Sequence, residues 1–175
     1  FLFYLQKKII QFTKEVLILL IIIGIIGNFI PFYLISWAEQ FIPSSTAGML
    51  MAIGPIITLI MSHFLTKNEK FSFIKFISIS IGLVGVFFIF NINSLDNLIS
   101  TNSIDIIAKL LVILAAFGYM LSNIIAYEKL SNIDSFSITT LATTFGAIFS
   151  LPFLIFDFSA NNYNFIFNYN SAYAI

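Results

Sequence analysis

Residues 16–37 of the 175-residue chain read VLILLIIIGIIGNFIPFYLISW, and no charged side chain interrupts them. A helix crosses about 30 Å of hydrocarbon with around 20 residues, because each residue adds about 1.5 Å. A strand of a membrane barrel would instead alternate apolar and polar side chains over about ten residues. Residues 16–23 are apolar at every position. The stretch therefore predicts a membrane-spanning α-helix.

Four further segments are similarly apolar and about as long: 45–65, 71–91, 105–127 and 135–156. Between the third and fourth spans, residues 91–104 are rich in Asn, Ser and Asp, which is the composition of a loop. The sequence therefore predicts an all-α fold, a polytopic transmembrane helix bundle of about five spans.

The composition agrees with lipid as the main solvent. Only 9% of the residues are charged, whereas about a quarter of the residues of a soluble protein are charged. The net charge is zero and no long basic run occurs, so the electrostatic footprint of a nucleic-acid-binding protein is missing. The lack of Cys and the single His exclude thiolate sites and multi-histidine metal centres. We expect no cofactor, no metal and no nucleic-acid partner.

The lysines are distributed unevenly between the two predicted sides of the membrane. With residue 1 in the cytoplasm, seven lysines fall on the cytoplasmic side and only Lys109 on the other. Lysine-rich loops stay in the cytoplasm, so this bias sets the direction of the spans. We expect a multi-pass protein of the plasma or inner membrane, with residue 1 cytoplasmic and residue 175 extracytoplasmic.

Two prolines, Pro31 and Pro55, lie inside predicted spans. Each removes a backbone hydrogen bond, so the carbonyls of Gly27 and Met51 lose their usual donors. Transporters use such interrupted helices to build a binding site or a hinge near the middle of the membrane. A static kink is an equally good explanation, because Pro is common in membrane helices.

Polar side chains at membrane depth are candidates for lining a cavity. Asn28 lies one turn before Pro31, and Thr139, Thr140, Thr143 and Thr144 stud the fifth span. For the threonines we favour hydrogen bonds back to their own helix. The small-residue pairs Gly48/Ala52, Ser78/Gly82 and Ala142/Gly146 predict close helix packing rather than a site. The candidate cavity or hinge residues are Asn28, Pro31, Ser36, Pro55, Tyr119 and Asn123.

No catalytic constellation is present. His63 stands alone near the cytoplasmic end of the second span, without a nucleophile at an interpretable spacing. A position at a helix end explains it better than a role as a base. We expect that the protein is not an enzyme.

A series of motifs across the first three spans resembles the first EamA repeat of the drug/metabolite transporter superfamily, from its third to its fifth helix. In that family a proline breaks the fourth helix, a glutamate follows it, and a glycine-containing fifth helix closes the repeat. The matching stretches are NFIPFYLISWAE at 28–39, SSTAGML at 44–50, AIGP at 52–55, KNEKFS at 67–72 and GLVGV at 82–86.

The later spans resemble the opening helices of the second repeat, through LAAFGY at 114–119, Asn123 and the Leu151-Pro152 helix end. The resemblance implies that residues 1–92 end a first repeat, 93–104 form an extracytoplasmic linker, and 105–175 hold family helices six, seven and the onset of eight. Family members have ten helices in two inverted repeats around a central cavity. We therefore expect this chain to be a fragment of a longer transporter.

The resemblance implies a permease-like exporter that moves a small metabolite, amino acid or drug by alternating access. The open alternative is a non-transporting multi-pass membrane subunit or scaffold, whose spans only pack on partners. The expected partners are the lipid bilayer, an unidentified small-molecule substrate, the missing helices of the same full-length chain and, as an open alternative, a second copy in a homodimer.

Overall fold

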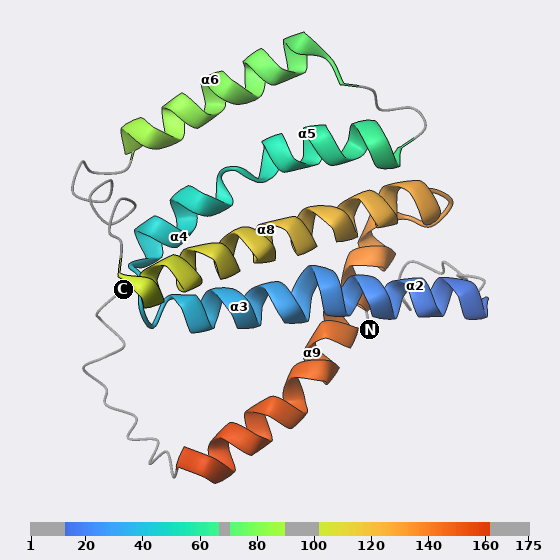
Figure 1. Cartoon of the computed structure of the whole chain (residues 1–175). Coiled ribbons are helices and arrows are strands. Elements are labelled where there is room, and N and C mark those ends of the chain that lie inside the picture. The colour runs from blue at the N-terminus through green and yellow to red at the C-terminus, as the bar shows by residue number, and fades with distance from the viewer. Residues whose placement is uncertain (1–12, 67–70, 90–101, 162–175) are drawn as a thin grey trace.

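The structure is a computed structural model that describes residues 13–66, 71–89 and 102–161 (Figure 1). These residues form helices joined by short turns, and no strand occurs among them. The predicted all-α class is therefore confirmed. In chain order the elements are α2 (Lys14–Gly24), the π-helix η1 (Ile25–Phe29), α3 (Ile30–Ala38), α4 (Ser44–Met51), α5 (Gly54–Leu65), α6 (Phe73–Ile89), α8 (Ser103–Lys129) and α9 (Ser135–Asn161).

Four helical stretches, two of them made of consecutive elements, are long enough to cross a membrane. Within the described residues, Lys14–Ala38, Ser44–Leu65, Ser103–Lys129 and Ser135–Ile155 qualify by length and hydropathy. The described part of the third predicted span is shorter, since α6 has 17 residues, or about 25 Å at 1.5 Å per residue. The prediction of about five spans is thus confirmed as four spans and one shorter apolar helix. The end of the predicted segment 71–91 lies outside the described residues.

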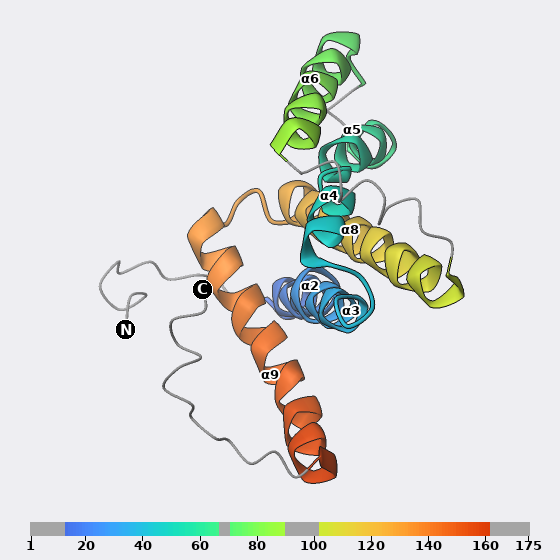
Figure 2. The same cartoon turned by 90° about the vertical axis from the view of Figure 1, so that its left-hand side faces the viewer.

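The helices lie side by side in an open row (Figure 1, Figure 2). At one edge α9 packs against α2 and η1, and the rod formed by α2, η1 and α3 packs against α8. On its other side α8 contacts α4 and α5, and α6 lies beside α5 at the far edge. The π-helix η1 therefore lies between α8 and α9.

Two small clusters of buried side chains hold the row together near opposite ends of α8. Ala108 and Val112 near its start pack with Ala38, Ile42 and Ala47. Leu130 just after its end packs with Leu20, Ile23 and Ala142. Alanines make up four of these nine side chains, and small residues are usual where helices associate in lipid.

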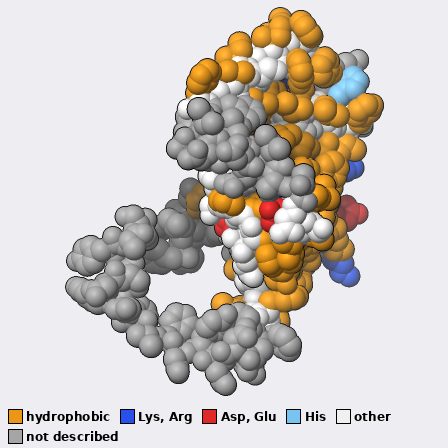
Figure 3. Space-filling model, turned by 60° about the vertical axis from the view of Figure 1, so that its left-hand side comes forward, with side chains coloured by type: hydrophobic (Ala, Val, Ile, Leu, Met, Phe, Trp, Pro, Cys, Tyr) orange, Lys and Arg blue, Asp and Glu red, His pale blue; other side chains and the backbone are white. Residues whose placement is uncertain are grey.

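The largest apolar side chains face outward. Phe88 is 86% exposed, Phe64 78% and Ile74 76%. Among the side chains coloured by type in Figure 3 most are hydrophobic, and the charged ones gather at only a few places. Such a surface would drive aggregation in water, but it matches the acyl chains of a bilayer.

A glycine seam joins α2 and η1 to α9. A Cβ added to Gly24 would stand 2.6 Å from the Ala142 carbonyl oxygen, and one added to Gly146 would stand 2.9 Å from the Asn28 Cβ. The predicted packing role of the Ala142/Gly146 pair is therefore confirmed. For the Ser78/Gly82 pair, in contrast, no atom of the described residues comes within 4 Å of a Cβ added to Gly82. Among these residues, Gly82 therefore does not make the close helix contact that was predicted.

The turn from α8 to α9 is fixed by the side chain of Asp134. One carboxylate oxygen of Asp134 accepts a hydrogen bond from the Ser137 N–H at 3.1 Å. The other oxygen accepts one from the Ser137 hydroxyl at 2.8 Å. This is the N-cap arrangement, which satisfies an otherwise unpaired N–H of the first helical turn. The cap starts α9, and the first turns of α9 line the cavity described below.

Candidate functional site

The helix break at Pro31 takes the form of a π-helical turn. The Ile30 N–H donates to the Ile25 carbonyl, one residue further back than in an α-helix. The Ile26 carbonyl therefore loses its α-helical donor, and Gly27 loses its own because Pro31 has no N–H. The sequence predicted the loss at Gly27 but not the one at Ile26. Single π-turns inside α-helices occur frequently at functional sites.

Glycines allow η1 to lie very close to α8. A Cβ added to Gly27 would overlap the Ser122 hydroxyl. One added to Gly118 would stand 3.0 Å from the Ile26 carbonyl oxygen and 3.7 Å from the Pro31 ring. The released Ile26 carbonyl therefore faces the backbone of α8 at Gly118, while Pro31 is itself buried.

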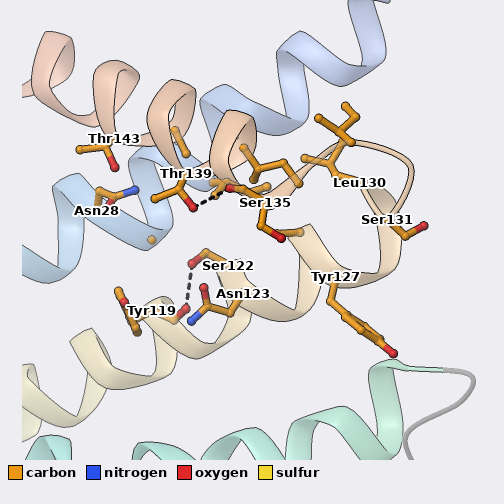
Figure 4. A pocket seen from close by; sticks show the side chains of 16 residues that line it. Asn28, Tyr119, Ser122, Asn123, Tyr127, Leu130, Ser131, Ser135, Thr139 and Thr143 are labelled. Carbon is orange, nitrogen blue, oxygen red and sulfur yellow. Dashed lines mark hydrogen bonds between the residues drawn. The ribbon is translucent and has the colours of Figure 1, made fainter. Parts of the chain in front are cut away.

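A cavity of about 460 Å³ lies between η1, the second half of α8 and the start of α9. Figure 4 shows Asn28 and Thr143 on one side of it, with Ser122 and Asn123 of α8 opposite them. Tyr127 and Ser131, which also border the cavity, point away from its centre. All of the lining residues are uncharged. We call this space the polar cavity.

A second cavity of about 370 Å³ adjoins the first, between η1, α3 and α9. Four of its ten lining residues are aromatic. The Phe29 and Phe153 ring centroids lie 5.1 Å apart, and those of Tyr33 and Phe153 6.0 Å. We call this space the aromatic cavity. Asn28 and Thr143 line both cavities and therefore stand at their junction.

The hydroxyls around the site differ in whether they are already hydrogen-bonded. Thr139, Thr140 and Thr144 donate to the carbonyl four residues earlier at 2.7 to 2.8 Å. This is the back-bonding that the sequence favoured for the threonines. Thr143 departs from it: among the described residues, the side chains of Thr143, Asn28 and Asn123 have no hydrogen-bonding partner. These three side chains therefore have hydrogen-bonding capacity to spare.

The structure brings most of the predicted candidates together. Asn28, Tyr119 and Asn123 line the polar cavity. Asn28 and Ser36 line the aromatic cavity. Phe153 was not predicted from the sequence, and Thr143 was not chosen as a candidate. The signal for Thr143 was its four-residue spacing from Thr139, which puts both side chains on one face of the helix.

Pro55 lies apart from both cavities. It is exposed near the start of α5, after a turn at Ala52 and Ile53 that separates α5 from α4. Because Pro55 has no N–H, the Met51 carbonyl lacks its α-helical donor, as the sequence predicted. Gly54 meets the tip of the Met120 side chain on α8, at 2.5 Å from an added Cβ. Pro55 therefore marks a helix break that packs on α8, not a cavity wall.

Curated relatives of the chain are named as transporters. YoaV, an uncharacterized transporter of Bacillus subtilis (strain 168), is 25% identical over 150 residues, which are 86% of this chain and 50% of YoaV. YetK, an uncharacterized transporter of the same organism, is 27% identical over 168 residues, 93% of this chain and 48% of YetK. The chain thus spans about half the length of these relatives. No solved structure matches the chain significantly.

The family assignment rests on the first half of the sequence. The sequence profile of the EamA-like transporter family matches residues 1–91, just over half of the 175 residues. An uncharacterized transporter of Buchnera aphidicola subsp. Schizaphis graminum (strain Sg) is 34% identical over 86 residues, 49% of this chain and 28% of that protein. With its apolar helices long enough to cross a bilayer, the protein is a multi-pass membrane protein. The chain belongs to the EamA-like transporter family.

Proposed function

We propose that the protein transports a small metabolite, amino acid or drug by alternating access, with the polar cavity as part of the substrate pathway. The observation that carries this proposal is the coincidence of a broken helix with unbonded polar side chains. Asn28 and Gly27 belong to the π-helical turn, and both line the cavity. In a membrane, such groups need a partner from protein, water or ligand, because lipid offers none.

Alternating access also needs elements that can change their relative orientation. Interrupted helices supply them, since a break absorbs a change of backbone angle without disrupting the helices on either side. The break before α3 borders the cavity, and the one before α5 packs on α8. Membership of a transporter family likewise favours transport over catalysis.

The test is a transport measurement on the protein as expressed from its own gene. Metabolites released by cells with and without the protein would first identify a transported compound. Asn28→Leu should then lower its initial transport rate in membrane vesicles about tenfold, since it removes a polar group at the junction of the cavities and adds bulk. The matched control is Asn132→Leu, because Asn132 is exposed in the α8–α9 turn and lines neither cavity.

Two results would contradict the proposal. Equal rates for wild type and Asn28→Leu with every transported compound would remove the cavity from the pathway. The lack of any compound whose release depends on the protein would favour the non-transporting subunit or scaffold.

A separate experiment tests the proposed orientation. The 175 residues contain no Cys, so each single cysteine introduced here is a new labelling site, and the protein without it is the background control. Gln40→Cys, between α3 and α4, should react in intact cells with a membrane-impermeant maleimide. Asn132→Cys, between α8 and α9, should react only after permeabilisation, because its turn lies on the same side as the start of α2. Labelling of Asn132→Cys in intact cells would reverse the orientation.

A further inference from the structure

We propose that the two cavities together form one binding site for an uncharged amphipathic molecule. Its polar group would be held by Asn28 and Thr143, and its apolar or aromatic part would occupy the aromatic cavity. This proposal depends on the proposed transport function in one respect: it takes the bound ligand to be the transported compound.

The shared walls of the two cavities locate the site. Asn28 of η1 and Thr143 of α9 line both spaces, so a molecule lying across the junction touches both side chains. The Gly146 backbone permits this arrangement, because an added Cβ there would stand 2.9 Å from the Asn28 Cβ. A ligand at the junction therefore meets polar groups from two different helices.

The hydrogen-bonding state of the threonines indicates what the polar group is. Thr139, Thr140 and Thr144 use their hydroxyl protons on their own helix, whereas Thr143 does not. An asparagine amide offers donors and an acceptor, and a threonine hydroxyl offers one donor and two acceptor lone pairs. A ligand hydroxyl or amide, which both donates and accepts, satisfies this pair. Without a hydrogen-bonding partner, the Asn28 amide and the Thr143 hydroxyl would raise the free energy of the protein in the membrane.

The charge of the lining argues against an ionic head group. All of the residues that line the two cavities are uncharged. Moving an ion from water into a site of low dielectric constant is costly unless an opposite charge compensates it. A polar group without net charge avoids this penalty, while keeping its hydrogen bonds to Asn28 and Thr143.

The aromatic cavity explains the apolar part. The rings of Phe29, Tyr33 and Phe153 lie 5.1 to 6.2 Å apart at tilted angles. Tilted and offset rings at such distances attract a further flat apolar group through dispersion and their quadrupoles. The cavity volumes of about 460 and 370 Å³ lie within the range usual for small-molecule sites.

Equilibrium binding to the protein in lipid nanodiscs tests the proposal, with empty nanodiscs subtracted. Phenyl β-D-glucoside has an uncharged polar head and an aromatic ring. Methyl β-D-glucoside keeps the head without the ring, and phenyl phosphate keeps the ring with a charged head. We expect phenyl β-D-glucoside to bind at least about tenfold more tightly than either partial probe.

Paired variants then locate the binding. Thr143→Val should weaken phenyl β-D-glucoside about fivefold, since it removes one hydroxyl at nearly constant volume. Phe153→Ala should weaken it about tenfold by removing a ring from the aromatic cavity. Thr58→Val and Phe88→Ala are the matched controls: Thr58 bonds back to the Gly54 carbonyl at 3.0 Å, Phe88 is 86% exposed, and neither lines a cavity. Both controls should bind as wild type does.

The outcomes separate this proposal from that of transport. Equal binding of phenyl phosphate, no binding above empty nanodiscs, or equal effects of target and control variants would each overturn the amphipathic site. Specific binding by a protein that transports no compound at all would leave the site intact and contradict the transport function instead.

Discussion

Gly24→Ala lowers the free energy of unfolding by about 2 kcal/mol, because the added methyl group separates α2 from α9. The new Cβ would stand 2.6 Å from the Ala142 carbonyl oxygen, 3.0 Å from the Phe145 Cβ and 3.1 Å from the Gly146 N. All three are backbone or Cβ atoms, so no flexible side chain can move aside. Alanine favours a helix over glycine by only about 0.5–1 kcal/mol, which does not offset the clash. Unfolding by sodium dodecyl sulfate in mixed micelles measures the difference.

Gly82→Ala is the matched control on α6. An added Cβ there meets no described atom within 4 Å. Only the helix propensity then remains, so the variant should be unchanged or more stable by up to about 1 kcal/mol. If Gly24→Ala proved as stable as Gly82→Ala, the seam between α2 and α9 would not be close-packed.

The helices could be predicted from the sequence because hydropathy alone decides them. In residues 16–37, length and the lack of charge leave few alternatives to a spanning helix, and the structure has one at Lys14–Ala38. The segment 71–91 corresponds to α6, which begins two residues later at Phe73, and the end of the segment lies outside the described residues. Apolar composition indicates the existence of a helix better than it indicates the ends of that helix.

The π-helical turn could not be predicted, although Pro31 correctly indicated a break. A proline requires only that one hydrogen bond be lost; it does not say how the chain redistributes the others. Here the Ile30 N–H shifts to the Ile25 carbonyl while Gly118 of α8 packs against the Ile26 carbonyl. The hydrogen-bond register of the turn is therefore accompanied by a contact with a residue nearly a hundred positions later in the chain. The local sequence around Pro31 does not reveal that contact.

The candidate site was predicted in part for a similar reason. Asparagine is rare at membrane depth, so Asn28 and Asn123 stood out, and both line the polar cavity. Thr143 did not stand out, because threonine in a helix usually bonds to its own backbone. Whether one particular hydroxyl does so depends on its rotamer and its neighbours, which the spacing of the threonines does not determine.

The second large effect concerns the contact between η1 and α8. Gly27→Ala should lower the free energy of unfolding by about 2–3 kcal/mol, because the added Cβ would overlap the Ser122 hydroxyl and stand 2.5 Å from the Ser122 Cβ. Ser122 is 3% exposed, and its hydroxyl donates to the Tyr119 carbonyl at 2.7 Å, so the side chain has little space to move. The same micelle unfolding experiment measures the loss.

Ser122→Gly should restore much of that stability when combined with Gly27→Ala. Alone, Ser122→Gly removes a hydroxyl and weakens α8 by about 0.5 kcal/mol through helix propensity. In the double variant the space vacated on α8 accepts the methyl group on η1, so the two effects should be non-additive by at least about 1 kcal/mol in the stabilising direction. Gly27→Ala combined with Ser78→Gly is the control, since Ser78 is an exposed serine on α6 whose hydroxyl also bonds back to its own helix. Additive losses in both double variants would mean that η1 does not pack against Ser122. If Ser122→Gly restores stability and Ser78→Gly does not, the π-helical turn packs against α8 at Ser122 and forms the wall of the polar cavity there.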